Sequence, residues 1–116
     1  PLSAIRLTET DEKLFSMRAG LYGAIEEYQQ KLDQQSKDFV DFGFSIRTNN
    51  VKIRSSELVV EIVSNALFIV GISAYKNDSS NSLSRHLRDS YGAALMVNND
   101  RIRNHNATMQ IAYREK

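Results

Sequence analysis

The sequence contains no cysteine and no tryptophan, and its only proline is Pro1. The lack of cysteine excludes disulfides, thiolate metal sites, iron–sulfur clusters and cysteine nucleophiles. Because no other proline and only five glycines interrupt the chain, long stretches are free of helix breakers. The longest apolar run, residues 66–72, is far shorter than the ~20 residues that a membrane-spanning helix needs. The sequence therefore favours long helices and argues against a transmembrane segment.

The composition is that of an ordinary globular domain. Hydrophobic residues make up 41% of the chain and charged residues 25%, values that argue against a disordered or fibrous protein. A length of 116 residues fits one domain, residues 1–116. The net charge of +1 gives no general attraction for polyanions. With no recognisable signal peptide, we expect a cytoplasmic protein that binds neither membranes nor nucleic acid.

The first predicted helix covers about residues 11–34. Thr8 or Thr10 marks its start, since a threonine can cap free backbone N–H groups. Gly20 and Gly23 lie inside it and each cost about 1 kcal/mol relative to alanine, which indicates close approach of another helix. Apolar residues recur at three- and four-residue steps, the pattern of an amphipathic helix: Leu14, Met17, Leu21, Ala24, Ile25, Tyr28 and Leu32.

Residues 36–50 break this period and predict an ordered loop. We expect its aromatic side chains to clamp the loop to the helices, because apolar loop residues usually seek burial. Its apolar residues alternate with polar or small ones in a partly strand-like pattern: Phe39, Val40, Phe42, Phe44 and Ile46.

A second helix is predicted over about residues 50–75. The β-branched residues within 58–63 make a buried strand the alternative, but the length and the regularly spaced polar face favour a helix. Glu57 and Glu61 lie on that polar face, and we interpret them as solvated side chains.

The rest of the chain predicts two shorter helices after a polar turn at residues 76–81. The first begins at Ser82 or Ser84 and runs through Tyr91, and Gly92 then permits a bend. The second extends from Met96 or Asn99 towards residue 113. Four helices and no strand make the predicted class all-α.

No self-contained catalytic or metal site is recognisable in the sequence. The glycines are scattered, and His86 and His105 lack the neighbouring ligands that a metal needs, so we interpret both as surface residues. Arg85, Arg88 and Asp89 are more informative, because two guanidinium groups and a carboxylate lie close together on one helix. We favour an ion-pair network between helices or subunits, with anion binding as the alternative.

Three segments carry a resemblance to a known family. They are Lys-Ile-Arg-Ser-Ser-Glu at 52–57, Ala-Leu-Phe-Ile-Val-Gly-Ile-Ser-Ala-Tyr at 66–75, and Arg-His-Leu-Arg-Asp at 85–89. In this order they resemble the carboxyl-terminal helical domain of the acyl-CoA dehydrogenase superfamily. The resemblance implies an up-down four-helix bundle that packs on identical subunits, helps to hold FAD at the interface, and belongs to a larger enzyme whose other domains precede Pro1.

Carrying the family's residues over assigns a cofactor role to Gly71, Asn99 and Arg101, and an interface role to Arg85, Arg88 and Asp89. The glutamine and the second glycine that meet FAD in the family are Phe68 and Ile72 here. Val97 stands where many members carry the catalytic glutamate, so no residue of this chain is assigned to catalysis.

Two functions follow from these observations. In the first, the chain is part of an FAD-dependent oxidoreductase acting on acyl-CoA or an acyl-carrier protein, and is inactive as an isolated domain. A flavin-dependent monooxygenase of the same fold is also open, because it needs no such glutamate, and a dehydrogenase stays open because some members of the family carry this base on an upstream helix. In the second, the chain is a stand-alone helical module that dimerises through its apolar faces. Its locally basic tail would then contact an acidic partner.

Overall fold

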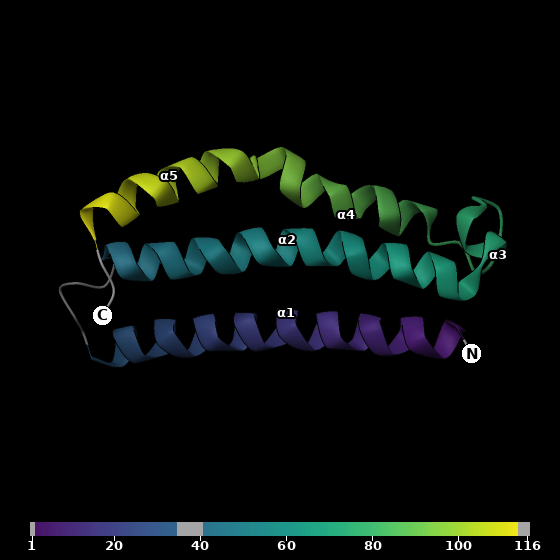
Figure 1. Ribbon diagram of the computed structural model, residues 1–116, viewed down its shortest axis with the longest axis horizontal. Helices are drawn as coiled ribbons and strands as arrows, with labels where there is room; N and C mark the ends of the chain where they lie inside the picture. Colours follow the sequence, from purple (N-terminus) through teal and green to yellow (C-terminus); the bar gives the residue numbers. More distant parts are fainter. Residues whose placement is uncertain (1, 35–40, 114–116) are drawn as a thin grey trace.

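Helix α2 forms the middle layer of the molecule, with α1 on one side and α4 and α5 on the other (Figure 1). The computed structural model describes residues 2–34 and 41–113, and all its regular elements there are helices, which confirms the all-α class. Because α4 and α5 follow one another along α2, four long helices make three layers. The helices are α1 (Leu2–Asp33), α2 (Phe42–Val70), the single turn α3 (Ile72–Tyr75), α4 (Ser84–Val97) and α5 (Asn99–Ala112).

Helix α1 begins at Leu2, so the predicted start near residue 11 is wrong. Thr8 and Thr10 are interior residues of the helix and cap nothing. Their hydroxyls donate hydrogen bonds to the carbonyls of Ala4 and Arg6, at 3.1 and 2.7 Å. No proline or glycine lies between positions 2 and 19, so nothing stops the helix from extending towards its amino terminus.

Helix α2 begins at Phe42, so the loop predicted for residues 36–50 is wrong for 42–50, and residues 36–40 lie outside the described part of the chain. Asp41 is the N-cap, and its carboxylate accepts a hydrogen bond from the Phe44 N–H at 2.6 Å. Phe44 is buried, while Phe42 remains 48% exposed. The cap overrides the strand-like alternation because it satisfies backbone donors that a loop would leave open.

Asp41 also forms an ion pair with Lys31. Lys31 at the end of α1 lies 3.2 Å from the Asp41 carboxylate. The Phe44 N–H is the main cause that lowers the pKa of Asp41 below its usual value; partial burial opposes this effect, and Lys31 adds to it. A lowered pKa means that the carboxylate stabilises the fold above its unfolded-state pKa of about 3.9, and that this contribution is lost as the pH falls through the folded-state value.

We therefore expect Asp41→Ala to lower the free energy of unfolding by about 1 kcal/mol at pH 7, the usual value of an N-cap. The difference between the variant and the parent chain should shrink when urea unfolding is repeated at about pH 3. Asp41→Asn is the matched control, because it keeps the cap and removes the charge. An equal loss for Asp41→Asn and Asp41→Ala would contradict the capping role.

The remaining helix ends follow local backbone chemistry. Residues 58–63 are helical, as predicted. Helix α2 ends at Val70, and its C-cap is Gly71, whose φ of 93° is a conformation that side chains disfavour. The bend predicted at Gly92 is wrong, because α4 passes through Gly92 to Val97. The break occurs instead at Asn98, with φ of 57°. Asparagine tolerates this left-handed conformation because its side chain can bond locally.

The three layers give an elongated molecule with a small core. The radius of gyration is 17.8 Å and the extents are 52 × 25 × 23 Å, whereas a compact domain of 100 residues has a radius near 13 Å. Leu58, near the middle of α2, is only 1% exposed. Buried apolar residues in the described chain are few: Phe44, Ile46, Ile53, Leu58, Ala74 and Met109.

None of the residues of α1, a helix that the structure describes throughout, is buried. Ion pairs hold it to α2: Glu27 contacts Arg47 at 2.8 Å and Lys13 contacts Glu61 at 3.7 Å. The predicted solvated role of Glu61 is therefore incomplete, since this carboxylate also joins two helices.

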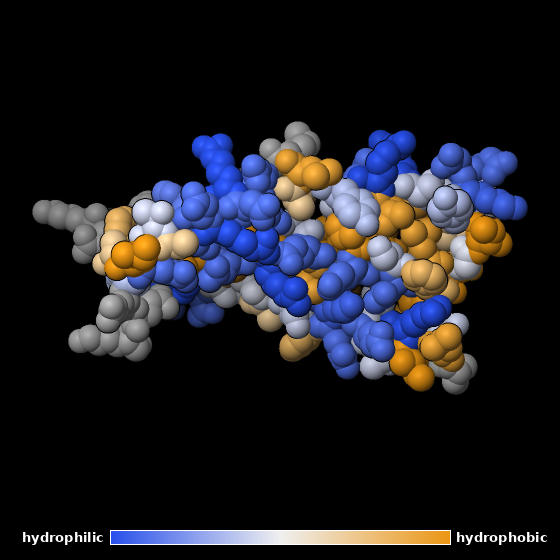
Figure 2. Space-filling view, turned by 45° about the horizontal axis from the view of Figure 1, so that its top comes forward, coloured by the Kyte–Doolittle hydropathy of each residue, from blue (hydrophilic) through white to orange (hydrophobic). Residues whose placement is uncertain are grey.

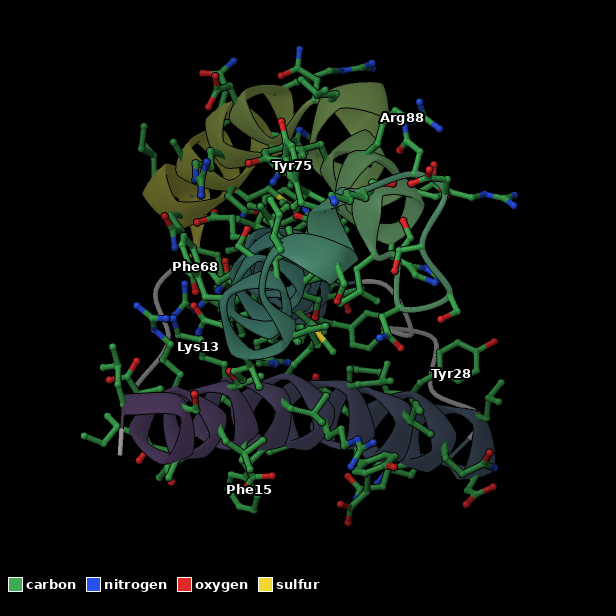
Figure 3. All side chains as sticks on the ribbon, turned by 90° about the vertical axis from the view of Figure 1, so that its right-hand side faces the viewer. Lys13, Phe15, Tyr28, Phe68, Tyr75 and Arg88 are labelled. Atoms are coloured by element: carbon green, nitrogen blue, oxygen red, sulfur yellow. The ribbon has the colours of Figure 1, made fainter. Side chains whose placement is uncertain are left out.

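Large apolar side chains remain exposed on α1. Phe15, 74% exposed, points away from α2 (Figure 3). A Cβ placed at Gly20 or Gly23 would meet nothing within 4 Å, so the close helix contact predicted there is wrong within this chain. The helix uses one face for folding and leaves the others open.

Candidate functional site

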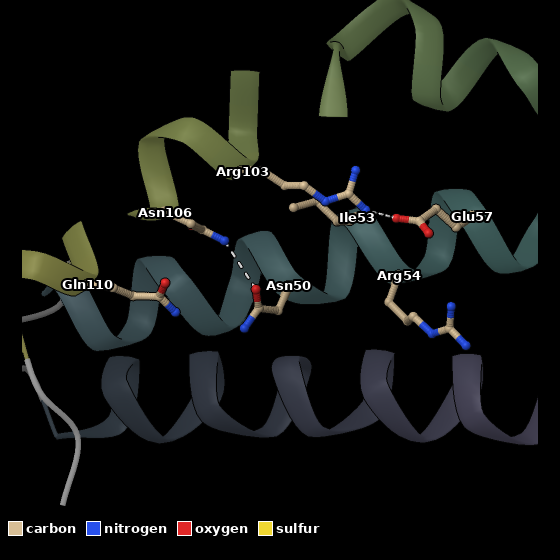
Figure 4. Close-up of a pocket in the computed structure, with 7 residues that line it drawn as sticks. All are labelled: Asn50, Ile53, Arg54, Glu57, Arg103, Asn106 and Gln110. Carbon is tan, nitrogen blue, oxygen red and sulfur yellow. Dashed lines mark hydrogen bonds and ion pairs between the residues drawn. The ribbon is translucent and has the colours of Figure 1, made fainter. Parts of the chain in front are cut away.

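A polar belt joins α5 to α2 (Figure 4). Arg103 forms an ion pair with Glu57, so the solvated role predicted for Glu57 is also incomplete. The side chain of Asn106, 6% exposed, accepts a hydrogen bond from the Asn49 side-chain amide at 3.0 Å and donates one to Asn50 Oδ1 at 3.1 Å. The groove along this belt has a volume of about 630 Å³, but its amides largely satisfy one another. The arrangement suits helix packing better than catalysis.

A second polar cluster lies where α4 passes into α5. The Asn99 amide donates to the Ser56 hydroxyl at 2.8 Å, and its carbonyl oxygen accepts from the Lys52 ammonium. Lys52 also donates to the Ala93 carbonyl at 3.1 Å, and Ser56 donates to the Ile53 carbonyl at 2.8 Å. Asn99 is 7% exposed, so both ends of its side chain are committed inside the molecule. The flavin contact predicted for Asn99 stays a prediction, and it requires this side chain to leave both partners.

Arg101 lies on the outside of the same turn. The backbone N–H of Arg101 lies 3.3 Å from the Asn98 side-chain oxygen, which caps α5. The Arg101 side chain is exposed and borders a pocket of about 480 Å³ that Asn49 and His105 also line. This side chain forms no ion pair with any described residue, so it is available to an anionic group.

Gly71 lies at the end of the molecule where α2 passes into α3. An open pocket of about 450 Å³ surrounds it, lined mainly by apolar side chains that include Phe68, Ile72, Tyr75 and Leu87. Phe68, Ile72 and Tyr75 are 64 to 69% exposed, and Figure 2 shows apolar surface gathered at this end. The Arg6 guanidinium lies 4.9 Å from the centre of the Phe68 ring, a cation–π contact from α1.

The interface residues predicted on α4 are all exposed. Arg85 and Asp89 form an ion pair at 3.6 Å within the helix, with side chains 84% and 64% exposed. Arg88 points outward (Figure 3) and forms no ion pair with a described residue. Within the part of the chain that is described, none of the three joins two helices, so a role between subunits stays a prediction.

The structure does not bring the three predicted cofactor residues together. Asn99 contacts Ser56 and Arg101 borders Asn49, whereas Gly71 ends the same helix. At 1.5 Å per residue, positions 49 and 71 are about 33 Å apart along α2. Gly71 and Arg101 of one chain thus belong to two separate surfaces.

The two histidines are the remaining candidates for catalysis or metal binding in residues 2–34 and 41–113. His86 and His105 are both exposed, as predicted for surface histidines, and no cluster of three metal-ligating side chains occurs in this part. Val97 ends α4, and its side chain lies outside the described part of the structure. Within the described ranges, every helix is either too short or too polar to span a lipid bilayer.

Sequence reasoning missed the cluster of Lys52, Ser56 and Asn99. A signal was present, since Asn49, Lys52 and Ser56 recur at three- and four-residue steps beside the apolar residues of α2. Polar residues with such spacing in a buried stripe indicate partners on another helix.

Comparisons with protein-family models, with curated proteins and with solved structures returned no match for this chain.

Proposed function

We propose that the chain is the carboxyl-terminal helical domain of an FAD-dependent, acyl-CoA dehydrogenase-like oxidoreductase, where it contributes to flavin binding and subunit packing. The observation that carries this proposal is the open apolar pocket at Gly71, in the segment whose sequence resembles the flavin-contacting turn of that family. The substrate would be an acyl group on coenzyme A or a carrier protein, and the cell compartment the cytoplasm. In this proposal the helices belong to the family's up-down four-helix bundle.

The residues around Gly71 fit a flat aromatic group. Because a Cβ at Gly71 would meet nothing within 4 Å, a ring can approach the backbone there. Phe68 stands in place of a glutamine of the family and Ile72 in place of a glycine, so contact would be through apolar packing and not through a side-chain amide. Bound FAD would supply the electron acceptor for substrate oxidation.

The separation of Gly71 from Arg101 supports a cofactor shared between subunits. One chain would offer the apolar surface at Gly71, and another would offer the exposed guanidinium of Arg101 to a phosphate or ring oxygen. Asn99 would act on the cofactor indirectly, by fixing the turn that presents Arg101. The surface residues Arg85, Arg88 and Asp89 would pair with charges of a neighbouring subunit.

The alternative of a stand-alone interaction module is favoured by the exposed apolar side chains of α1. A flavin-dependent monooxygenase is favoured by Val97, since a valine cannot accept a proton. In each case the fold of the chain is the same. Bound flavin separates the two flavoenzymes from the interaction module, and the reaction catalysed separates the dehydrogenase from the monooxygenase.

The test is to express the complete reading frame that encodes this chain and to measure flavin in the purified protein. We expect a yellow protein, and we expect Gly71→Val to lose most of its flavin because the branched side chain occupies the pocket and disfavours a φ of 93°. Gly92→Ala is the control, because a Cβ there also meets nothing within 4 Å. A colourless parent protein would overturn the proposal and favour the interaction module.

A further inference from the structure

The outward side of α1 carries a regular stripe of residues, all of them exposed except the half-buried Leu14. Leu7, Phe15 and Tyr22 are 59, 74 and 63% exposed, respectively. Successive residues of this stripe lie one to four positions apart in the sequence, so they share one side of the helix. A groove of about 270 Å³ runs along much of this side. We define the outer stripe as Leu7, Asp11, Leu14, Phe15, Arg18 and Tyr22.

The outer stripe is symmetric about its midpoint, between Leu14 and Phe15. Asp11 and Arg18, a pair of opposite charges, lie at equal distances in the sequence on either side of this midpoint. Leu7 and Tyr22, an apolar pair, lie farther out, again at equal distances from it. Such a pattern is self-complementary under a two-fold rotation, which places each residue of one helix opposite its symmetric counterpart in a second copy.

The charges of the stripe lack partners within the described chain. The side chains of Asp11 and Arg18 form no ion pair or hydrogen bond with a described residue, and both residues are exposed. They are also too far apart to pair with each other, since seven residues of helix span about 10 Å. A second α1 in the opposite direction would bring each charge to its complement. A parallel second copy would set like charges against each other, which is unfavourable.

We propose that two copies of this chain associate through the outer stripe, with their α1 helices antiparallel and the two-fold axis between Leu14 and Phe15. The apolar residues supply the main attraction, because Phe15 and Tyr22 are aromatic and each such side chain buries on the order of 150–250 Å². Ala4 and Ile25 extend the same symmetry by one more step, and Ile25 is 54% exposed. The pair of Asp11 and Arg18 determines the relative direction and the register of the two α1 helices.

The association is independent of the cofactor, so a colourless complete enzyme would leave it standing. Sedimentation equilibrium of the 116-residue chain should give a concentration-dependent dimer. Asp11→Arg and Arg18→Asp should each raise the dissociation constant by roughly tenfold, because each variant creates two like-charge contacts across the axis. The double variant with both changes should return the dissociation constant to that of the parent chain.

Glu12→Arg provides the matched control, since it reverses an exposed charge that lies outside the stripe. Circular dichroism should show unchanged helix content in all four variants. A monomer at every concentration, or a double variant no tighter than the single ones, would overturn the proposal.

Direction can be tested separately because the chain has no cysteine of its own. An equal mixture of Leu7→Cys and Tyr22→Cys chains should form mixed disulfide dimers on mild oxidation. Leu7→Cys alone should not, since the two copies of position 7 are about 22 Å apart in the antiparallel pair. Efficient cross-linking of Leu7→Cys to itself would show a parallel pair and overturn the proposed geometry.

Discussion

Leu58→Ala is expected to lower the free energy of unfolding by about 3 kcal/mol, the largest effect of any single truncation in this chain. Leucine-to-alanine changes in well-packed cores cost about 2–5 kcal/mol, because apolar contacts are lost and a cavity remains. Leu58 is 1% exposed and is the only fully buried large side chain among the described residues. A three-layer molecule offers few other core residues to take over its contacts.

Urea unfolding followed by circular dichroism measures this change, with Leu95→Ala as the matched control. Leu95 lies on α4 and is 76% exposed, so its truncation should change stability by less than about 0.5 kcal/mol. A loss below about 1 kcal/mol for Leu58→Ala would contradict a core centred on the middle of α2.

Asn99→Ala is expected to cost about 2–3 kcal/mol, although it removes only a small polar side chain. The change leaves the Lys52 ammonium with one fewer acceptor and the Ser56 hydroxyl without its donor. Unpaired buried polar groups cost about 1–3 kcal/mol, and more when they are charged. The loss should also loosen the junction between α4 and α5.

A double-mutant cycle separates this network from simple packing. Lys52→Met and Asn99→Leu combined should cost less than the sum of the two single changes, because the pair removes both ends of one interaction. Asn104→Ala, at an exposed position of α5, is the control. Strict additivity would show that Lys52 and Asn99 act independently. All variants are measured by urea unfolding at pH 7.

The helical class and the course of α2 were predictable, because Leu58, Ile62 and Ala66 recur at four-residue steps, a helical period that the β-branched residues within 58–63 do not cancel. Helix ends were less predictable, since several residues can cap or break a helix equally well. Thr8 and Thr10 have capping side chains but lie inside α1, whereas Asp41 caps α2 in a segment that alternates like a strand. The chain bends at Asn98 and not at Gly92. The conformational freedom of a glycine allows a bend but does not require one.

The candidate site was only partly predictable for a related reason. Resemblance in sequence pointed to Gly71, Asn99 and Arg101, but not to their environments. The commitment of Asn99 to Lys52 and Ser56 depends on residues more than forty positions away in the sequence. Similarly, the position of Arg101 beside Asn49, about 33 Å along α2 from Gly71, depends on how α5 packs against α2.

The lack of buried residues in α1 has a consequence for local unfolding. Helix α2 contains six buried residues and contacts every other helix, so its central amides should exchange with solvent only on global unfolding. Helix α1 can detach without opening the contacts of α2 with α4 and α5. Its amides should therefore exchange faster, through a partly unfolded state in which the rest of the molecule stays intact. An association that covers α1 would slow this exchange as protein concentration rises.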